Sequence, residues 1–269
     1  MSVRGRLCDD RRVSFEADAA VYDRHVGRYA GALSAAHIAA AGVSRDDHVL
    51  DVGCGPGGLT RALADLVGAE SVAAVDPSKS FVAACASRVP GADVRDGAAE
   101  SLPFDAGAFD VVLSQLVVNF MRDADAGVAE MVRVARGGGS VASCVWDYAD
   151  GMTMLRSFWD GALDVDPDAP DEARTMRYCS EPELRELWLR GGLHDVDTGA
   201  LVVEAAYDDF DDYWAPFPTG LAPSGAYCAS LDPEGQEALR VAVFRRLGEP
   251  AGPFTLTARA WFVRGSVGN

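Results

Sequence analysis

The sequence predicts an α/β fold in which helices cover both faces of a mostly parallel sheet. Short apolar segments alternate with segments whose apolar residues recur at helical spacing, and a glycine-rich loop joins the first strong apolar segment to a helix. Elements that alternate at these lengths form parallel sheets, which bind ligands at the carboxyl ends of their strands. The chain of 269 residues is long enough for one such domain with insertions.

Seven segments have the apolar character of buried strands. They are residues 48–52, 71–75, 93–95, 110–115, 140–146, 196–207 and 254–263. Apolar residues recur at helical spacing in residues 19–41, 58–67, 78–88 and 124–136. The three glycines Gly137–Gly139 are expected to end the last of these helices. The pattern predicts a Rossmann-like, seven-stranded, mostly parallel sheet with a small helical or irregular lid.

The second half of the chain interrupts the alternation twice. Residues 149–180 are rich in Asp, Pro and Met and are expected to form a lid, and a second insertion is expected at residues 208–250. Between them, Ser180 and Glu183 form a capping box that begins a helix, and Gly191 ends that helix. Both insertions follow strands, where a substrate cover would lie.

Composition excludes several classes of partner. The formal net charge of −17 repels phosphate polymers, so neither nucleic acid nor an anionic membrane is expected as a partner. The six cysteines and four histidines are scattered without metal-ligand spacing, so we expect neither a metal site nor a disulfide framework. No signal peptide and no apolar run of roughly 20 residues is visible, which predicts a cytoplasmic protein. We expect a monomer or homodimer that acts on a small molecule.

A glycine-rich loop follows the first strand and opens a helix. Residues 49–60 read VLDVGCGPGGLT, in which Gly53, Gly55 and Gly57 let the backbone turn sharply and approach a ligand closely. The helix that starts near Gly58 offers unpaired N–H groups to a carboxylate or phosphate. A tight turn without any ligand would use the same glycines.

Two carboxylates accompany this loop. Asp76 ends the next strand, where it is placed to accept hydrogen bonds from two ribose hydroxyls or to cap the helix at Ser78. The loop also satisfies the GxGxxG pattern, so a nicotinamide dinucleotide is a competing ligand. Asp51, two residues before the first glycine, favours a cationic sulfonium amino acid over a pyrophosphate.

With these motifs the chain resembles the class I methyltransferases of the methyltransferase-11 type over nearly its whole length. Further matching segments are GAAESLPF at 97–104, FDVVLSQ at 109–115 and RGGG at 136–139. Ala98 stands where the family often has Asp, and Gly137 stands where it has proline. The resemblance implies S-adenosyl-L-methionine as the cofactor.

The resemblance also implies where the cofactor would lie. Asp51 and the glycine loop would lie near its methionine part, Asp76 at its ribose, and the backbone of 97–104 at its adenine. Tyr22-Asp23-Arg24 and Gly27-Arg28-Tyr29 resemble an N-terminal helix that closes over the cofactor, although a solvated Arg28 and a packed Tyr29 fit the spacing equally well. The implied cofactor-binding residues are Arg28, Tyr29, Asp51, Gly53, Gly55, Gly57, Asp76, Pro77, Ala99, Glu100 and Gln115.

Candidates for the acceptor side lie after the fourth and fifth strands. Methyl transfer requires alignment of the nucleophile, exclusion of water and, for hydroxyl or acidic carbon acceptors, removal of a proton. The predicted catalytic residues are Gln115, Asn119 and Tyr148, although Asn119 would equally serve as a turn former and Tyr148 as core. The acidic and aromatic run at 208–214 would favour a neutral or cationic acceptor if it formed a lid edge, or is a solvated helix N-terminus.

Three functions remain open. The first is methyl transfer to O, N or C of a small molecule. The second is another displacement on the same cofactor, such as cyclisation or aminopropyl-type transfer, and the third is a cofactor-binding regulatory protein. In each case we expect a cover helix and the cofactor-binding half in 1–148, an inserted lid in 149–180, and the last strands with the second insertion in 181–269.

Overall fold

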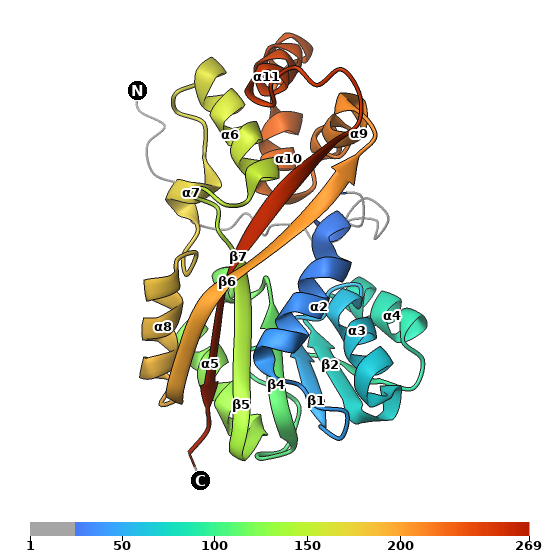
Figure 1. Ribbon diagram of the computed structural model, residues 1–269, viewed down its shortest axis with the longest axis vertical. Coiled ribbons are helices and arrows are strands. Elements are labelled where there is room, and N and C mark those ends of the chain that lie inside the picture. Colours follow the sequence, from blue (N-terminus) through green and yellow to red (C-terminus); the bar gives the residue numbers. More distant parts are fainter. Residues whose placement is uncertain (1–24, 269) are drawn as a thin grey trace.

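The computed structural model describes residues 25–268, and its centre is one seven-stranded sheet (Figure 1). The strand order is β3-β2-β1-β4-β5-β7-β6, in which the first five strands are parallel and β7 runs antiparallel to both of its neighbours. This confirms the predicted Rossmann-like fold. The strands are β1 (Val49–Val52), β2 (Val72–Asp76), β3 (Asp93–Asp96), β4 (Phe109–Gln115), β5 (Ala135–Trp146), β6 (His194–Tyr207) and β7 (Phe254–Ser266).

The position of β1 creates the binding crevice. β1 and β2 are buried at every position, as expected for apolar strands covered on both faces. The chain leaves β1 toward β2 on one side, while β4 pairs with β1 on the other side. The loops after β1 and β4 therefore diverge at this topological switch point, and a crevice opens at the carboxyl ends of the strands.

Helices cover both faces of the sheet (Figure 1). The helices α2 (Ala30–Ala41), α3 (Gly58–Val67) and α4 (Lys79–Arg88) pack on one face, and α5 (Ala124–Val134) and α8 (Glu181–Arg190) pack on the other. Residues 19–24 of the expected first helix lie outside the described residues. Short 3-10 turns are η1 (Val26–Tyr29), η2 (Ala69–Ser71), η3 (Val118–Phe120) and η4 (Phe217–Thr219).

The two insertions pack together as one helical cap above the sheet (Figure 1). We use the term cap for α6 (Thr153–Val165), α7 (Glu172–Thr175), α9 (Phe210–Trp214), α10 (Ala222–Ser230) and α11 (Pro233–Arg246). Gly161 of α6 allows the backbone of α11 to approach, because a Cβ atom there would lie 2.8 Å from the amide nitrogen of Val243. The rings of Phe158 and Phe217 stack with centroids 4.4 Å apart.

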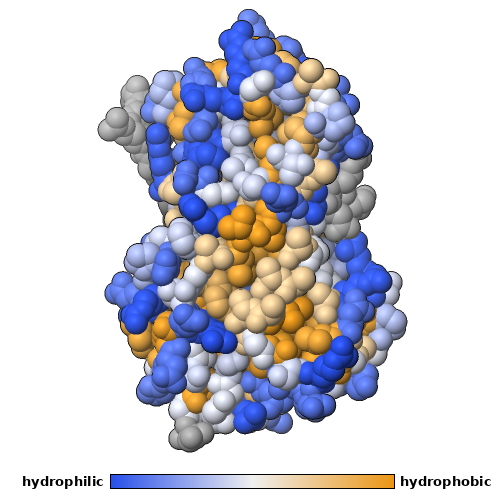
Figure 2. Space-filling model, viewed as in Figure 1, coloured by the Kyte–Doolittle hydropathy of each residue, from blue (hydrophilic) through white to orange (hydrophobic). Residues whose placement is uncertain are grey.

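The long strands β6 and β7 connect the two lobes. Both extend from the sheet into the cap, so that the second insertion is carried on their far ends (Figure 1). The outline of the molecule narrows where the lobes meet, and apolar residues gather on the visible face at this level (Figure 2). Within residues 25–268, no helix combines the length and the apolar character that crossing a bilayer requires.

Two local predictions need correction or refinement. The helix expected at 124–136 ends at Val134, and Gly137–Gly139 belong to β5 rather than to the helix end. The strand continues through the glycines because Gly138 and Gly139 exchange backbone hydrogen bonds of 3.0 and 2.8 Å with Val267. At the start of α8, the hydroxyl of Ser180 donates to the Glu183 carboxylate at 2.8 Å and accepts no backbone N–H, so the predicted capping box does not form, although the helix begins and ends where the sequence predicts.

Candidate cofactor and acceptor site

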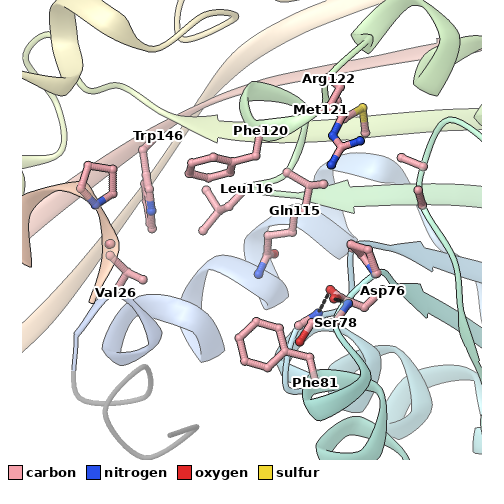
Figure 3. A pocket seen from close by; sticks show the side chains of 18 of the residues that line it. Val26, Asp76, Ser78, Phe81, Gln115, Leu116, Phe120, Met121, Arg122 and Trp146 are labelled. Atoms are coloured by element: carbon pink, nitrogen blue, oxygen red, sulfur yellow. Dashed lines mark hydrogen bonds between the residues drawn. The ribbon is translucent and has the colours of Figure 1, made fainter. Parts of the chain in front are cut away.

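A cavity of about 600 Å³ lies at the carboxyl ends of the parallel strands, beneath the cap. Its two ends differ in character. Asp76, Ser78 and Phe81 lie at one end, Trp146 and Phe120 lie at the other, and the side chain of Gln115 points between them (Figure 3). The volume falls in the range of small-molecule sites, which are generally apolar with a few placed polar groups.

The glycine loop and Asp76 form one hydrogen-bonded unit at the first end. The carboxylate of Asp76 accepts the N–H of Gly55 at 2.9 Å and the N–H of Ser78 at 2.8 Å. Asp76 therefore supports the start of α4 and also lines the cavity, so the two roles considered from the sequence are compatible. Burial raises the pKa of Asp76, while these two N–H groups act to lower it.

Gly53 and Gly55 line the cavity, whereas Gly57 does not. All three have positive φ, and a Cβ atom on Gly55 would meet nothing within 4 Å, so its α-carbon faces open space. A Cβ atom on Gly57 would lie 3.2 Å from the α-carbon of Cys85 on α4. Gly57 thus allows the loop to pack on α4, while Gly53 and Gly55 form the cavity wall.

Asp51 is buried behind the loop and is not among the residues that line the cavity. The hydroxyl of Thr60 donates to its Oδ2 atom at 2.7 Å, and its Oδ1 atom has no hydrogen-bond partner within the described part of the chain. Burial raises the pKa of Asp51 to about 7, and the nearby charge of Asp76 acts in the same direction. A cation or hydrogen-bond donor nearby would stabilise the ionised form.

Other residues named from the sequence also reach the cavity wall. Pro77, Ala99 and Glu100 line it beside Asp76, although the Glu100 carboxylate accepts the N–H of Arg122 at 2.9 Å. Gln115 at the end of β4 donates to Ser34 at 3.1 Å. Its Oε1 atom is buried with no hydrogen-bond partner among residues 25–268.

The structure does not bring Arg28 and Tyr29 to the cavity. Arg28 is held by Asp212 through two hydrogen bonds of 2.8 Å and lies over the ring of Tyr207. Tyr29 is fully buried, and its hydroxyl lies 3.1 Å from that of Tyr207. These residues join η1 to the cap, and their neighbours His25 and Val26 line the cavity instead.

Of the three predicted catalytic residues, Gln115 and Tyr148 line the cavity and Asn119 does not. The amide nitrogen of Asn119 lies 3.5 Å from the Tyr148 hydroxyl and 3.8 Å from the sulfur of Met176. Asn119 therefore lies in η3 behind Tyr148, facing Met176 of the first insertion. Tyr148 itself is largely buried, with 5% of its surface exposed.

The sequence did not identify two buried polar residues in the cavity wall, His25 and Glu172. Both ring nitrogens of His25 lack a hydrogen-bond partner in the described chain, and burial lowers its pKa to about 4. Glu172 begins α7 in the first insertion and is only 2% exposed. A glutamate in a segment rich in acidic residues is typical of a solvated surface, so composition gave no signal for its burial.

Known proteins share this arrangement and its sequence. A family model described as a methyltransferase domain matches residues 50–143, which include β1, the glycine loop, Asp76 and β4. An uncharacterized protein of Mycobacterium tuberculosis is 34% identical over 222 residues, which cover 76% of this chain and 78% of that protein. The chain belongs to the class I, methyltransferase-11 type of S-adenosylmethionine-dependent methyltransferases.

Two further proteins are similar to this methyltransferase. The phthiotriol/phenolphthiotriol dimycocerosates methyltransferase of M. tuberculosis is 38% identical over 150 residues, covering 53% of this chain and 49% of that protein. The phosphoethanolamine N-methyltransferase 2 of Haemonchus contortus, solved with S-adenosylmethionine, has the same fold with a TM-score of 0.54. That match is 18% identical and covers 88% of this chain and 52% of the solved one.

The cavity of this methyltransferase fits its cofactor, S-adenosylmethionine. Asp76 places a carboxylate on the cavity wall at the glycine-loop end, which suits a ligand with ammonium, sulfonium and ribose hydroxyl groups. The open α-carbon of Gly55 leaves space for the ligand beside this carboxylate. A pyrophosphate would be repelled by the carboxylate of Asp76.

Proposed function

We propose that this methyltransferase transfers the methyl group of S-adenosylmethionine to a small-molecule acceptor that binds at the cap end of the cavity. The observation that carries the proposal is the continuity of the cavity. One space of about 600 Å³ extends from Gly55 and Asp76, the cofactor end, to Trp146 and Leu221 beneath the cap. A cofactor and an acceptor that share one enclosed space can be aligned for an in-line displacement.

The cofactor supplies an activated methyl group on a sulfonium, and the protein has three tasks around it. Asp76 and the glycine loop bind the cofactor at the ends of β1 and β2, and Asp51 supports the loop from behind by accepting the hydroxyl of Thr60. The cap covers the carboxyl ends of the strands and excludes water. The apolar wall at the far end, formed in part by Phe120 and Trp146, orients an acceptor with an apolar surface.

Incubation of the protein with methyl-labelled S-adenosylmethionine and a small-molecule cell extract tests the proposal. We expect a labelled, methylated product and S-adenosylhomocysteine in equal amounts. Methylthioadenosine would indicate an aminopropyl-type transfer instead. Cofactor binding without any turnover would indicate a regulatory protein, and either result would refute methyl transfer. Asp76→Ala serves as the control with an impaired cofactor site.

A further inference from the structure

The acceptor end of the cavity contains a buried carboxyl group that cofactor binding does not use. Glu172 lines the cavity from α7 with 2% of its surface exposed. The surrounding wall is largely apolar and includes Leu116, Phe120 and Leu155. Burying a carboxyl in such a wall is costly unless it gains partners, so its position calls for an explanation.

Within residues 25–268, one side chain donates a hydrogen bond to this carboxyl. The indole nitrogen of Trp159, in the middle of α6, donates to Oε2 of Glu172 at 2.8 Å. The neighbouring cation, Arg156, is held by Asp171 through hydrogen bonds of 3.1 and 3.0 Å and by Asp160 at 2.9 Å. Because Arg156 is shared between these two carboxylates, Glu172 has no ion pair among the described residues.

The groups around Glu172 leave it able to exchange a proton near neutral pH. Burial raises the pKa of Glu172 to about 7, and the charge of Asp171 adds to this effect. The Trp159 N–H and the charge of Arg156 act to lower the pKa of Glu172. Cys179 is also within electrostatic reach of Glu172. His25 and Tyr148 face the same cavity from η1 and from the end of β5.

We propose that the acceptor is a largely apolar molecule with an uncharged hydroxyl group, and that this hydroxyl donates a hydrogen bond to Glu172, which takes its proton during methyl transfer. This proposal rests on the proposed function and specifies its substrate class. The hydroxyl oxygen forms a bond to the methyl carbon, and the bond from that carbon to sulfur breaks with its electron pair left on sulfur. The hydroxyl proton passes to the carboxylate of Glu172, so charge and atoms balance.

Charge and chemistry favour a hydroxyl over other acceptor groups. An anionic acceptor would be repelled by Glu172, by the carboxylate of Asp76, and by the net charge of −17. A neutral amine carries its own nucleophilic lone pair and needs no base before attack. A neutral hydroxyl gains most from a base whose pKa lies close to the working pH.

Binding of two matched probes to the protein loaded with S-adenosylhomocysteine tests this proposal. The probes are 2-naphthol and naphthalene, which differ only in the hydroxyl group, and equilibrium dialysis at pH 8 gives their affinities. We expect 2-naphthol to bind about tenfold more tightly than naphthalene, the effect of about one hydrogen bond to a charged group. Glu172→Gln should lose most of this preference, because its one amide oxygen still accepts from Trp159 and its NH2 group cannot accept from the hydroxyl. Asp168→Asn removes one exposed charge from the same insertion and should keep the preference.

Calorimetry of 2-naphthol binding at pH 7 in two buffers of different ionisation enthalpy adds a second readout. A hydroxyl donating to the carboxylate favours its ionised form, so we expect a fraction of a proton to be released in the wild type and none in Glu172→Gln. Equal affinity for the two probes, or proton uptake on binding, would overturn the proposal. If Glu172→Gln does not fold, Glu172→Asp retracts the carboxylate by one methylene, and an unchanged preference in that variant would also overturn it.

The labelled-extract assay separates this proposal from the proposed function. A wild-type protein that methylates nothing refutes the proposed function, whereas the dialysis result still decides the role of Glu172. Where the wild type does methylate a product, Glu172→Gln should be about 100-fold slower with unchanged affinity for S-adenosylhomocysteine. Equal rates, or a product methylated on nitrogen or carbon, would refute the hydroxyl proposal alone.

Discussion

Arg28 and Asp212 form a two-pronged ion pair across 184 positions of the chain, with both hydrogen bonds 2.8 Å long. The pair joins η1, beside the cavity, to α9 of the cap. Their side chains are 18% and 20% exposed, so solvent screens this pair less than a surface pair. We infer that this ion pair fixes η1 against the cap.

A double-mutant cycle with Arg28→Met and Asp212→Asn measures this link. We expect a coupling free energy of about 1–2 kcal/mol from urea unfolding, because each single variant removes the hydrogen bonds that join the two largely buried side chains. The exposed pair of Arg246 and Asp164 provides the control and should show weaker coupling. Coupling for Arg28 and Asp212 no larger than for the control would mean that the pair does not fix the cap.

Gly55 and Gly57 should respond differently to the same substitution. Gly57→Ala places a Cβ atom 3.2 Å from the backbone of Cys85 at a φ of +95°, so we expect it to destabilise the protein by about 1–3 kcal/mol. Gly55→Ala meets no atom within 4 Å at a φ of +52°, and its cost should be smaller. Because Gly55 lines the cavity, its variant should weaken binding of S-adenosylhomocysteine. Thermal unfolding and calorimetry on both variants check the contrast, which a larger loss of stability in Gly55→Ala would contradict.

Asp76→Ala should weaken cofactor binding more than it weakens folding. The ribose hydroxyls would lose one or two charge-assisted hydrogen bonds, which corresponds to a roughly ten- to hundredfold increase in the dissociation constant or more. The N–H groups of Gly55 and Ser78 also lose their acceptor, so some loss of stability is expected. Asp65→Ala, on the exposed side of α3, is the matched control. An unchanged dissociation constant would leave Asp76 with the supporting role alone.

Asp51 should make the unliganded protein less stable as pH rises from about 4 to 7. Its pKa is about 7 in the folded protein and near 3.9 in an unfolded chain, so the folded state holds the proton more tightly. The contribution of Asp51 to the free energy of unfolding is complete below pH 4 and is lost as pH rises through 7. Asp51→Asn should flatten this slope and be more stable than the wild type at pH 8 by up to a few kcal/mol, on the order of 1.4 per pKa unit. The raised pKa of Glu172 also makes the protein less stable as pH rises. The dependence of stability on pH should therefore weaken in Asp51→Asn without vanishing.

Urea unfolding of the wild type and Asp51→Asn between pH 4 and 8 measures this effect. Asp65→Asn, which removes an exposed carboxylate, should retain the slope of the wild type. Identical slopes in the wild type and Asp51→Asn would contradict a protonated Asp51 in the unliganded protein.

Local sequence patterns were sufficient to predict the sheet and the glycine-loop end of the site. A buried strand, a glycine turn, a helix and an acidic strand end lie within 28 positions, from Val49 to Asp76, and the order of buried parallel strands fixes where they meet. Gly53, Gly55 and Asp76 accordingly lie at the cavity. Gly137–Gly139 misled the prediction because glycines that end helices also occur within strands.

The cap end depends on contacts between distant segments. Arg28 is drawn from the cavity by Asp212, and no spacing in the sequence signals this partner. Glu172 is buried by α6 and by the wall beneath the cap, although its neighbours in the sequence are polar. Tertiary packing of two insertions decides these positions, so they could not be derived from periodicity or composition.

Calorimetric titration of the protein with S-adenosylhomocysteine, and separately with NADH, tests the cofactor site most directly. We predict that S-adenosylhomocysteine binds to one site per chain, since Gly53, Gly55 and Asp76 line one end of a single cavity. S-adenosylmethionine should compete for that site, and NADH should give no comparable binding. Binding of NADH with neither adenosyl ligand bound would contradict the assignment of this cavity to S-adenosylmethionine.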